Sequence, residues 1–500
     1  MTLPPETDVV PGHLDYSVAP HTARPNPTAA PSPRQVRDED EASEAPATIA
    51  TVLARPRFAF LVAGQTISQL GDKLHHMALI ALVGAGAATN AGGLELAKLS
   101  VVFTAPVVLF GPLAGAMVDR WNKRTVMIAC DALRTLLVAS IPALFAATGQ
   151  LWPVYIVAFL VFLLGVFFNA AKMALIPELV PRSHLLAANA ALTFVGRFAT
   201  VLGIVGGGVI IGLAFWHRVG WSDYAAGFYM DATSYLVSVL TLLGIVALGR
   251  GRAAPAPAHA LHAVQQRHDS PTDPSPATPP ADFRVKRSFG TVVGDVVRTL
   301  SVIRHDRALR FVFGTLVALS LFASTVYVAM TYSVQTVMGR GTKGVGYLGG
   351  ILGAGMIVGS LLVGTVGSRW DKRRTILTGN AIIGFLMLLG GVFFSFTIFA
   401  PVAFLGGALL APVMVSQDTL LHESAPPTAR ALVFSTKDLI LAGVFMLSAL
   451  AVGGTIYLLG LLGVDEPYRL ALSGVGLVVL TSGVAGQLSL AAERRRARQG

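Results

Sequence analysis

Long apolar runs, separated by short polar breaks, make up most of the chain beyond residue 57. A helix needs about 20 apolar residues to cross the hydrocarbon core of a bilayer, and the runs reach that length. The predicted spans are 58–86, 95–117, 124–147, 152–175, 188–213, 226–248, 309–335, 344–367, 374–396, 398–421, 432–458 and 467–490. The pattern therefore predicts an all-α membrane protein with twelve transmembrane helices in two bundles of six.

Three segments without such runs divide the chain. The first is rich in proline, alanine and acids and the second in proline and alanine, so neither can bury a core. Later in the second segment, apolar residues recur at helical spacing among arginines, which predicts an amphipathic helix at about 286–305. The predicted parts are a disordered cytoplasmic tail at 1–55, a six-helix bundle at 56–249, a cytoplasmic linker at 250–308, a six-helix bundle at 309–490 and a basic cytoplasmic tail at 491–500.

Basic residues lie in alternate loops between the predicted spans. Lysine and arginine are enriched on the cytoplasmic side of membrane proteins, so this alternation predicts cytoplasmic termini in the inner membrane of a bacterium. The chain is 53% hydrophobic and only 13% charged, whereas a soluble domain carries about 25% charged residues. The net charge of +11 is therefore attributed to membrane orientation, and we expect no nucleic-acid partner.

A short repeat relates the two halves of the chain. The sequence Arg-Trp-x-Lys-Arg begins at Arg120 and again at Arg369, about half the chain apart. Gly115 in the first copy matches Gly364 in the second. Such a repeat is expected of two pseudo-symmetric bundles with parallel topology.

The first copy resembles the signature loop of the major facilitator superfamily, which reads Gly, three residues, Asp, Arg, any residue, Gly and a basic run. The resemblance implies a latch that closes the cytoplasmic side, with the glycine letting two helices approach closely. The implied gating residues are Gly115, Asp119, Arg120, Lys123 and Arg124, with Arg369 and Arg373 in the second copy. Asn122 replaces the family's glycine, and asparagine tolerates a left-handed turn. Ser368 lies opposite Asp119, so we expect the latch mainly in the first half.

The resemblance extends over most of residues 55–490. The pieces GQTISQLGD, DALRTLLV and MDATSYLVS are similar to a subgroup of exporters that contains the enterobactin exporter and the macrolide-efflux type proteins. This similarity implies export and leaves the substrate open.

The first predicted span carries the largest set of polar side chains within the membrane. Its polar face consists of Gln65, Gln69, Asp72 and His76, spaced by four, three and four residues. Residues at this spacing share one helix face, which we expect to line a central cavity. An ionisable group at the bilayer centre costs about 2.5–3.5 kcal/mol on insertion scales and is functional by default. We expect Asp72 to carry a coupling proton, with Arg197 as modulator; the alternative is a permanent ion pair of Asp72 with Lys73 or Arg197.

Three further charged side chains are expected to have structural roles. Asp131 and Arg134 lie one turn apart in the third span and are expected to brace the signature loop. Lys172, near the inner end of the fourth span, is expected to reach the membrane interface.

The seventh, eighth and ninth spans are almost free of charge, which suits an apolar cavity wall.

These patterns favour proton-coupled export of a small amphipathic or apolar compound, such as a drug, a siderophore or a related metabolite, by alternating access. The expected partners are that substrate, protons and the lipid bilayer, and the chain is expected to act as a monomer. The alternatives are an importer or lipid-type transporter on the same fold, and a membrane sensor or scaffold without transport. We expect no enzyme, catalytic residue, metal or cofactor, because the sequence shows no nucleophile constellation, metal-ligand set or nucleotide-binding motif.

Overall fold

The computed structural model describes residues 48–87, 91–213, 215–250, 289–367, 370–425 and 430–499. Within these residues the regular structure is helical, and no strand occurs. Residues 1–47 of the tail expected at 1–55, and residues 251–288 of the linker expected at 250–308, lie outside the described residues.

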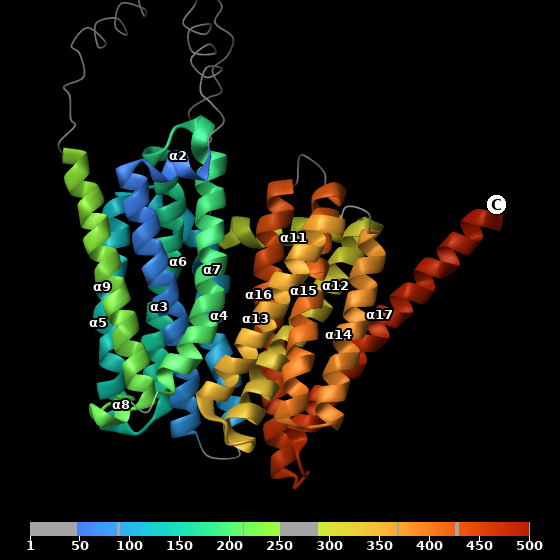
Figure 1. Ribbon diagram of the computed structural model, residues 1–500. Coiled ribbons are helices and arrows are strands. Elements are labelled where there is room, and N and C mark those ends of the chain that lie inside the picture. Colours follow the sequence, from blue (N-terminus) through green and yellow to red (C-terminus); the bar gives the residue numbers. More distant parts are fainter. Residues whose placement is uncertain are drawn as a thin grey trace, which may run out of the picture. The chain divides into compact units, whose positions relative to one another are not determined.

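The first bundle is built from six long helices with three short ones beside them (Figure 1). Its elements are α2 (Ile49–Leu53), α3 (Pro56–Gly86), α4 (Gly92–Val118), α5 (Lys123–Thr148), α6 (Leu151–Leu179), η1 (Arg182–His184), α7 (Leu185–Ile211), α8 (Phe215–Arg218) and α9 (Asp223–Arg250). Inside it, α3 packs along α9 and α7, and α5 packs between α6 and α9.

The second bundle follows the amphipathic helix α11 (Phe289–His305). Its elements are α12 (Arg307–Thr325) with the π-helical segments η2 (Val326–Met330) and η3 (Ser333–Val337), α13 (Gly341–Val366), α14 (Lys372–Val392), α15 (Phe396–Ser424), α16 (Arg430–Leu461) and α17 (Pro467–Gln499). Here α14 packs along α17, and α13 packs along α15. Helix α17 continues through the basic end of the chain to Gln499.

Eleven helices of the described residues are long and apolar enough to cross a membrane. Helix α3 is not one of these eleven, although it has 31 residues, because its polar side chains lower its hydropathy. With α3 included, the helices agree with the twelve spans expected from the sequence.

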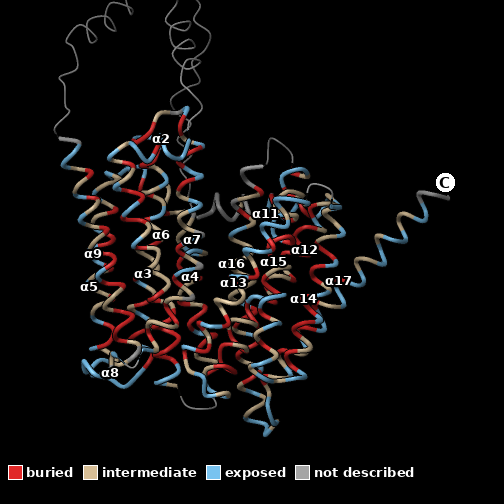
Figure 2. Tube along the Cα trace, viewed as in Figure 1, coloured by how far each residue is buried: buried red, intermediate tan, exposed pale blue. Residues whose placement is uncertain are grey.

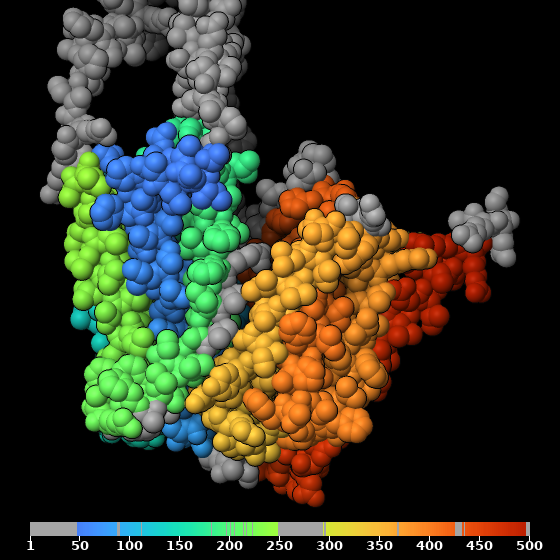
Figure 3. Space-filling view, in the orientation of Figure 1, coloured from blue at the N-terminus to red at the C-terminus, as the bar shows by residue number. Residues whose placement is uncertain are grey.

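The two bundles contact each other near the end where α3 ends at Gly86 and α13 begins at Gly341. We call this the closed end. Helix α4 packs against α16, and α7 packs against α13; Figure 3 shows α13 lying against α7 near this end. A Cβ atom on Gly208 would lie 2.3 Å from the Cα of Gly346, so the two backbones touch directly. Gln335 Nε2 also donates a hydrogen bond to the carbonyl oxygen of Ile80 at 2.8 Å.

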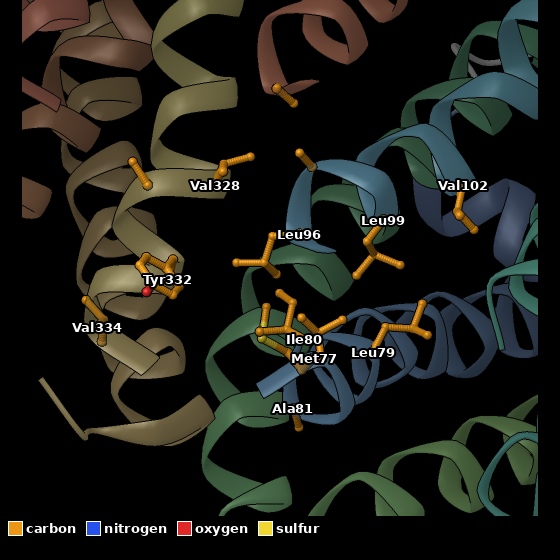
Figure 4. Close-up of a cluster of buried hydrophobic side chains, with 14 of the residues drawn as sticks. Met77, Leu79, Ile80, Ala81, Leu96, Leu99, Val102, Val328, Tyr332 and Val334 are labelled. Atoms are coloured by element: carbon orange, nitrogen blue, oxygen red, sulfur yellow. The ribbon is translucent and has the colours of Figure 1, made fainter. Parts of the chain in front are cut away.

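Apolar side chains from both bundles form one core at the closed end. Figure 4 shows part of this core, where side chains of α3 and α4 face those of the segment 326–337 that follows α12. The labelled members are Met77, Leu79, Ile80, Ala81, Leu96, Leu99, Val102, Val328, Tyr332 and Val334. Figure 2 shows buried residues concentrated toward this end of the helices. The cluster holds the bundles together here, since burial of apolar area is the main attractive term.

At the opposite end, which carries the two Arg-Trp loops, the ion pairs among described residues join helices of the same bundle. They are Lys123–Glu178 in the first bundle, and Arg307–Glu493, Lys372–Glu423, Lys437–Asp418 and Arg494–Asp371 in the second. We call this the loop end. The described ion pairs therefore brace each bundle separately there.

Candidate functional site

A cavity of about 330 Å³ lies inside the first bundle, between α3, α5, α6 and α7. It is lined by Gln65, Ser68, Gln69, Asp72, Lys73, Arg134, Phe168, Asn169, Lys172, Met173, Asn189, Leu192, Thr193 and Thr200. Gln65, Gln69 and Asp72 reach it together because they follow one another at helical spacing on α3.

Asp72 contacts the cavity on one side and a buried tyrosine on the other. The hydroxyl group of Tyr235, on α9, donates a hydrogen bond to Asp72 Oδ1 at 2.5 Å. The ring of Tyr235 lies beneath the guanidinium group of Arg134, whose Cζ is 4.8 Å from the ring centroid. Asp72 is thus connected through Tyr235 to a charged group of a third helix.

Arg134 and Asp131 form a buried pair on α5. The pair has 3.5 Å between Arg134 Nη1 and Asp131 Oδ1, and Arg134 Nε donates to the carbonyl oxygen of Val161 at 3.1 Å. Asp131 is fully buried, and Arg134 is 7% exposed. The expectation that this pair braces the signature loop is wrong, because both side chains turn into the bundle toward α6 and α9.

A second buried pair lies beside the first, between α3 and α9. His75 Nδ1 is 3.1 Å from Asp231 Oδ2, and both side chains are almost fully buried. The hydroxyl group of Ser234 donates to Asp231 Oδ1 at 3.2 Å. The rings of Phe162 and Phe228 contact the imidazole edge to face, which separates this pair from solvent.

His76 does not line the cavity, contrary to expectation. Its ring packs against Phe103 with 4.6 Å between centroids, and against Phe162 with 5.9 Å. Phe103 in turn contacts Tyr327 and Phe445 of the second bundle. The spacing keeps His76 on the same face of α3, so the reason is its position along the helix. At about 1.5 Å per residue, His76 lies about 6 Å beyond Asp72, where α3 has reached the contact between the bundles.

Arg197 falls within α7, but its side chain lies outside the described residues. Lys73, the other expected partner of Asp72, lines the cavity beside it.

Lys172 projects into the cavity, so the expectation that it reaches the membrane interface is wrong. Its Nζ donates hydrogen bonds to Gln65 Oε1 at 3.1 Å and to Asn169 Oδ1 at 2.8 Å. Two amide oxygens hold the ammonium group inside the bundle, which a hydropathy pattern cannot show.

The signature loop is a tight connection between α4 and α5. Asp119 is the C-cap residue of α4, and both Asp119 and Arg120 are exposed. Lys123 lies 3.6 Å from Glu178 of α6, and Arg124 is half-buried in the first turn of α5. A Cβ atom on Gly115 would have no described atom within 4 Å. The close helix contact expected at Gly115 is therefore absent from the described residues in this conformation, in which the bundles meet at the closed end.

Asn122 does not adopt the left-handed turn expected from the resemblance. Its φ is −70° and its side chain accepts hydrogen bonds from the backbone N–H groups of Arg124 and Thr125, so it caps α5. An asparagine serves better than a glycine here because it supplies an oxygen to the free N–H groups of the first turn.

Asp371 has the same role in the second copy, where it caps α14 and pairs with Arg494. Partial burial alone would raise the pKa of Asp371, but hydrogen bonds from the Arg374 backbone and the Arg494 guanidinium lower it below its usual value. The second copy thus carries an acid at the helix cap. Arg373 lies over the ring of Phe311, while Arg369 lies outside the described residues, as does Ser368.

Sequence reasoning missed the contribution of α9 to this site. Asp231 and Tyr235 lie one turn apart on that helix, and both turn toward α3. The signal was present in the piece MDATSYLVS, where an acid and a tyrosine share a helix face within an apolar run.

Comparisons with known proteins agree on one family. The model of the Major Facilitator Superfamily matches residues 58–436. The chain is 29% identical over 182 residues to YfiS of Bacillus subtilis (strain 168), described as an uncharacterized MFS-type transporter. It is 28% identical over 153 residues to Rv0037c of Mycobacterium tuberculosis (strain ATCC 25618 / H37Rv), described in the same words. These matches cover 36% and 31% of this chain, and 40% and 35% of the length of those relatives.

Solved structures resemble the chain over most of its length. A bacterial homologue of the human lysosomal transporter Spinster has a TM-score of 0.59 at 13% identity, covering 86% of this chain and 96% of that one. The nucleoside transporter NupG (D323A mutant) has a TM-score of 0.57 at 14% identity, covering 85% and 99%. A peptide transporter POT in complex with sulfate has a TM-score of 0.60 at 12% identity, covering 87% and 94%. At such identities the likeness concerns the fold.

Proposed function

We propose, since this chain belongs to the Major Facilitator Superfamily, that it is a secondary active transporter that exports a small amphipathic or apolar compound in exchange for protons. The proposed substrate is a drug, a siderophore or a related metabolite. Transport proceeds by alternating access, in which contacts at the closed end break and contacts at the loop end form. The resemblance to the subgroup of the enterobactin exporter and the macrolide-efflux type proteins supports the direction of transport.

The position of Asp72 carries this proposal. Its carboxylate faces the cavity and accepts a hydrogen bond from Tyr235, so it lies between a site that a substrate can enter and a buried network. Among the described basic side chains, none lies within ion-pair distance of Asp72, and its close partner is a neutral phenol. This arrangement favours a carboxyl group that gains and loses a proton over a permanent ion pair.

We expect Asp72→Asn to reduce accumulation driven by a pH gradient about tenfold, because the amide cannot carry the coupling proton while its shape is preserved. The measurement is uptake into inside-out vesicles under an imposed gradient. The transported compound is first identified by a screen, as one whose export from cells rises when the protein is overexpressed.

The control is Asp465→Asn, which alters an exposed acid in the turn before α17 and should leave accumulation unchanged. Exchange of labelled for unlabelled compound without a gradient should persist in Asp72→Asn. Normal export by Asp72→Asn with its pH dependence intact would show that Asp72 is not the coupling site.

The gate is proposed at the loop end, with Asp119 as its acid. We expect Asp119→Ala to lower the turnover rate about tenfold while binding is retained, because the variant lacks the charge that holds the closed loop end. Stopped-flow efflux from proteoliposomes measures the rate. Asp438→Ala, an exposed acid in the second bundle, is the control. Unchanged turnover in Asp119→Ala would refute the latch.

We also propose that the loop end faces the bacterial cytoplasm. The basic residues of the alternate loops gather there, and an even number of spans places both termini on that side. A monomer suffices, because the cavity is enclosed by helices of one chain.

A further inference from the structure

The charges of the cavity wall are unequal. Among the described residues that line the cavity, Lys73, Arg134 and Lys172 are basic, whereas Asp72 is acidic. The other lining residues are neutral. A wall of this composition attracts anions, and the attraction is strong where water is partly excluded.

Two of the four charges are already engaged within the bundle. Arg134 is paired with Asp131 behind the wall, and Asp72 accepts the hydroxyl group of Tyr235. The charge of Arg134 is therefore offset by Asp131 within the bundle. The phenol does not cancel the charge of Asp72, so the wall presents two lysines against one carboxylate.

Lys172 is the better placed of these lysines. Both of its described hydrogen-bond partners are amide oxygens, at 3.1 Å on Gln65 and 2.8 Å on Asn169. An amide dipole orients an ammonium group but does not cancel its charge, and a charge within a bundle normally has a charged partner. An ammonium group has three donors, so the third remains for an acceptor from the cavity.

The remaining wall suits the body of an amphipathic molecule. Phe168, Met173 and Leu192 supply apolar surface, and Asn189 and Thr193 supply hydrogen-bonding groups beside it. The volume of about 330 Å³ lies at the lower end of the range of about 300–1,000 Å³ for small-molecule sites. It favours a compact molecule over a two-chain lipid.

We propose that this cavity binds a small organic anion, with its carboxylate on Lys172 and Lys73 and its apolar part against Phe168, Met173 and Leu192. The inference rests on the proposed transport function, because it names the class of substrate for the same cavity. The inference narrows the proposed substrate class from amphipathic or apolar compounds to amphipathic anions.

The test measures binding without any gradient, so that its outcome is independent of proton coupling. The full-length chain in lipid nanodiscs is titrated with three acids, benzoate, 2-naphthoate and decanoate, and with the neutral amide of each. Competition of each compound against a labelled member of the set is measured by scintillation proximity. We expect at least one acid to bind about tenfold more tightly than its amide.

The variants separate the role of the charge from the role of the fold. Lys172→Gln should abolish the preference for the acid, and Lys172→Arg should keep most of it. Lys98→Gln, at an exposed lysine of α4 paired with Glu95, is the matched control and should behave as the unaltered chain does. If Lys172→Gln fails to fold, Lys73→Gln is tested in the same way and should weaken the preference.

Two outcomes overturn the inference: no acid in the set is preferred over its amide, or the preference survives in both lysine variants. A preference for the acid together with a failure of pH-driven export would leave the anion site standing and remove the proposed proton coupling. The reverse result would remove the anion site alone.

Discussion

Replacing Asp131 by leucine is expected to lower the free energy of unfolding by about 3–5 kcal/mol, because it leaves the charge of Arg134 buried without its partner. Asp131 is fully buried and Arg134 is 7% exposed, so water can reach the guanidinium group only from the cavity and is a poor substitute for the missing carboxylate. The hydrogen bond from Arg134 to Val161 and the ring of Tyr235 remain, but neither carries a negative charge. Titration with dodecyl sulfate in mixed micelles, followed by circular dichroism, measures the change.

The double variant Asp131→Leu with Arg134→Met provides the decisive comparison. Removing both charges replaces a buried ion pair by apolar side chains, which is often neutral or stabilising. We therefore expect the double variant to recover most of the lost stability. A pair whose lysine is exposed is the control: Lys98→Ala leaves Glu95 with its hydrogen bond from Tyr155 and should change stability by less than about 1 kcal/mol. A double variant as unstable as the single one would show that packing, and not the unpaired charge, is responsible.

Replacing Gly208 by valine is expected to shift the conformational equilibrium away from the closed-end contact by about 5- to 150-fold. A Cβ atom at this position would lie 2.3 Å from the Cα atom of Gly346 and 2.9 Å from its nitrogen, and backbone atoms cannot move aside as a side chain can. Overpacking of this kind costs about 1–3 kcal/mol. The opposite conformation, in which α7 and α13 separate at this end, escapes the cost.

The equilibrium can be followed by distance measurements between spin labels. Cys130 is the one cysteine of the chain and is buried. The substitution Cys130→Ala therefore gives a cysteine-free background, into which new cysteines can be introduced and spin-labelled. Labels at Gln150 and Asp465, both exposed, report the separation of the bundles at the closed end. We expect a longer distance to dominate in Gly208→Val.

The matched control lies on the same helix. A Cβ atom on Gly206 would meet only the flexible end of Ile210, at 3.7 Å, so Gly206→Val should leave the distance distribution unchanged. Equal distributions in Gly208→Val and in the unaltered chain would mean that the contact adapts without opening.

The helices were predictable because their apolar runs are long and their ends are marked. Asn122 and Asp371 cap the helices that follow them, and Gly149 ends α5 in the left-handed conformation. Polar side chains lower the hydropathy of helix α3, and it was still predicted from its length and flanking breaks. What the sequence could not provide is the pairing of helices, since apolar runs carry little information about which neighbour each one meets.

The candidate site was predictable only along α3. Helical spacing brings Gln65, Gln69 and Asp72 together, and they line the cavity. The contacts of Tyr235 and Lys172 depend on α9 and α6, which pack against α3 from more than 80 residues away. His76 shows the limit of the argument, because it shares the face but lies one turn farther along α3, where Phe103 covers it.

The polar face of α3 has a consequence for how the protein enters the membrane. A helix with Asp72, Lys73 and two histidines near its middle partitions poorly into lipid by itself, since each charged residue opposes insertion by about 2.5–3.5 kcal/mol. The groups that accommodate this face, among them Tyr235 and Asp231, belong to α9 and leave the ribosome some 160 residues later. We therefore expect the first span to become stable in the bilayer only once the sixth has been synthesised. Insertion of the first bundle would then be a cooperative step, in which α3 and α9 enter the bilayer together.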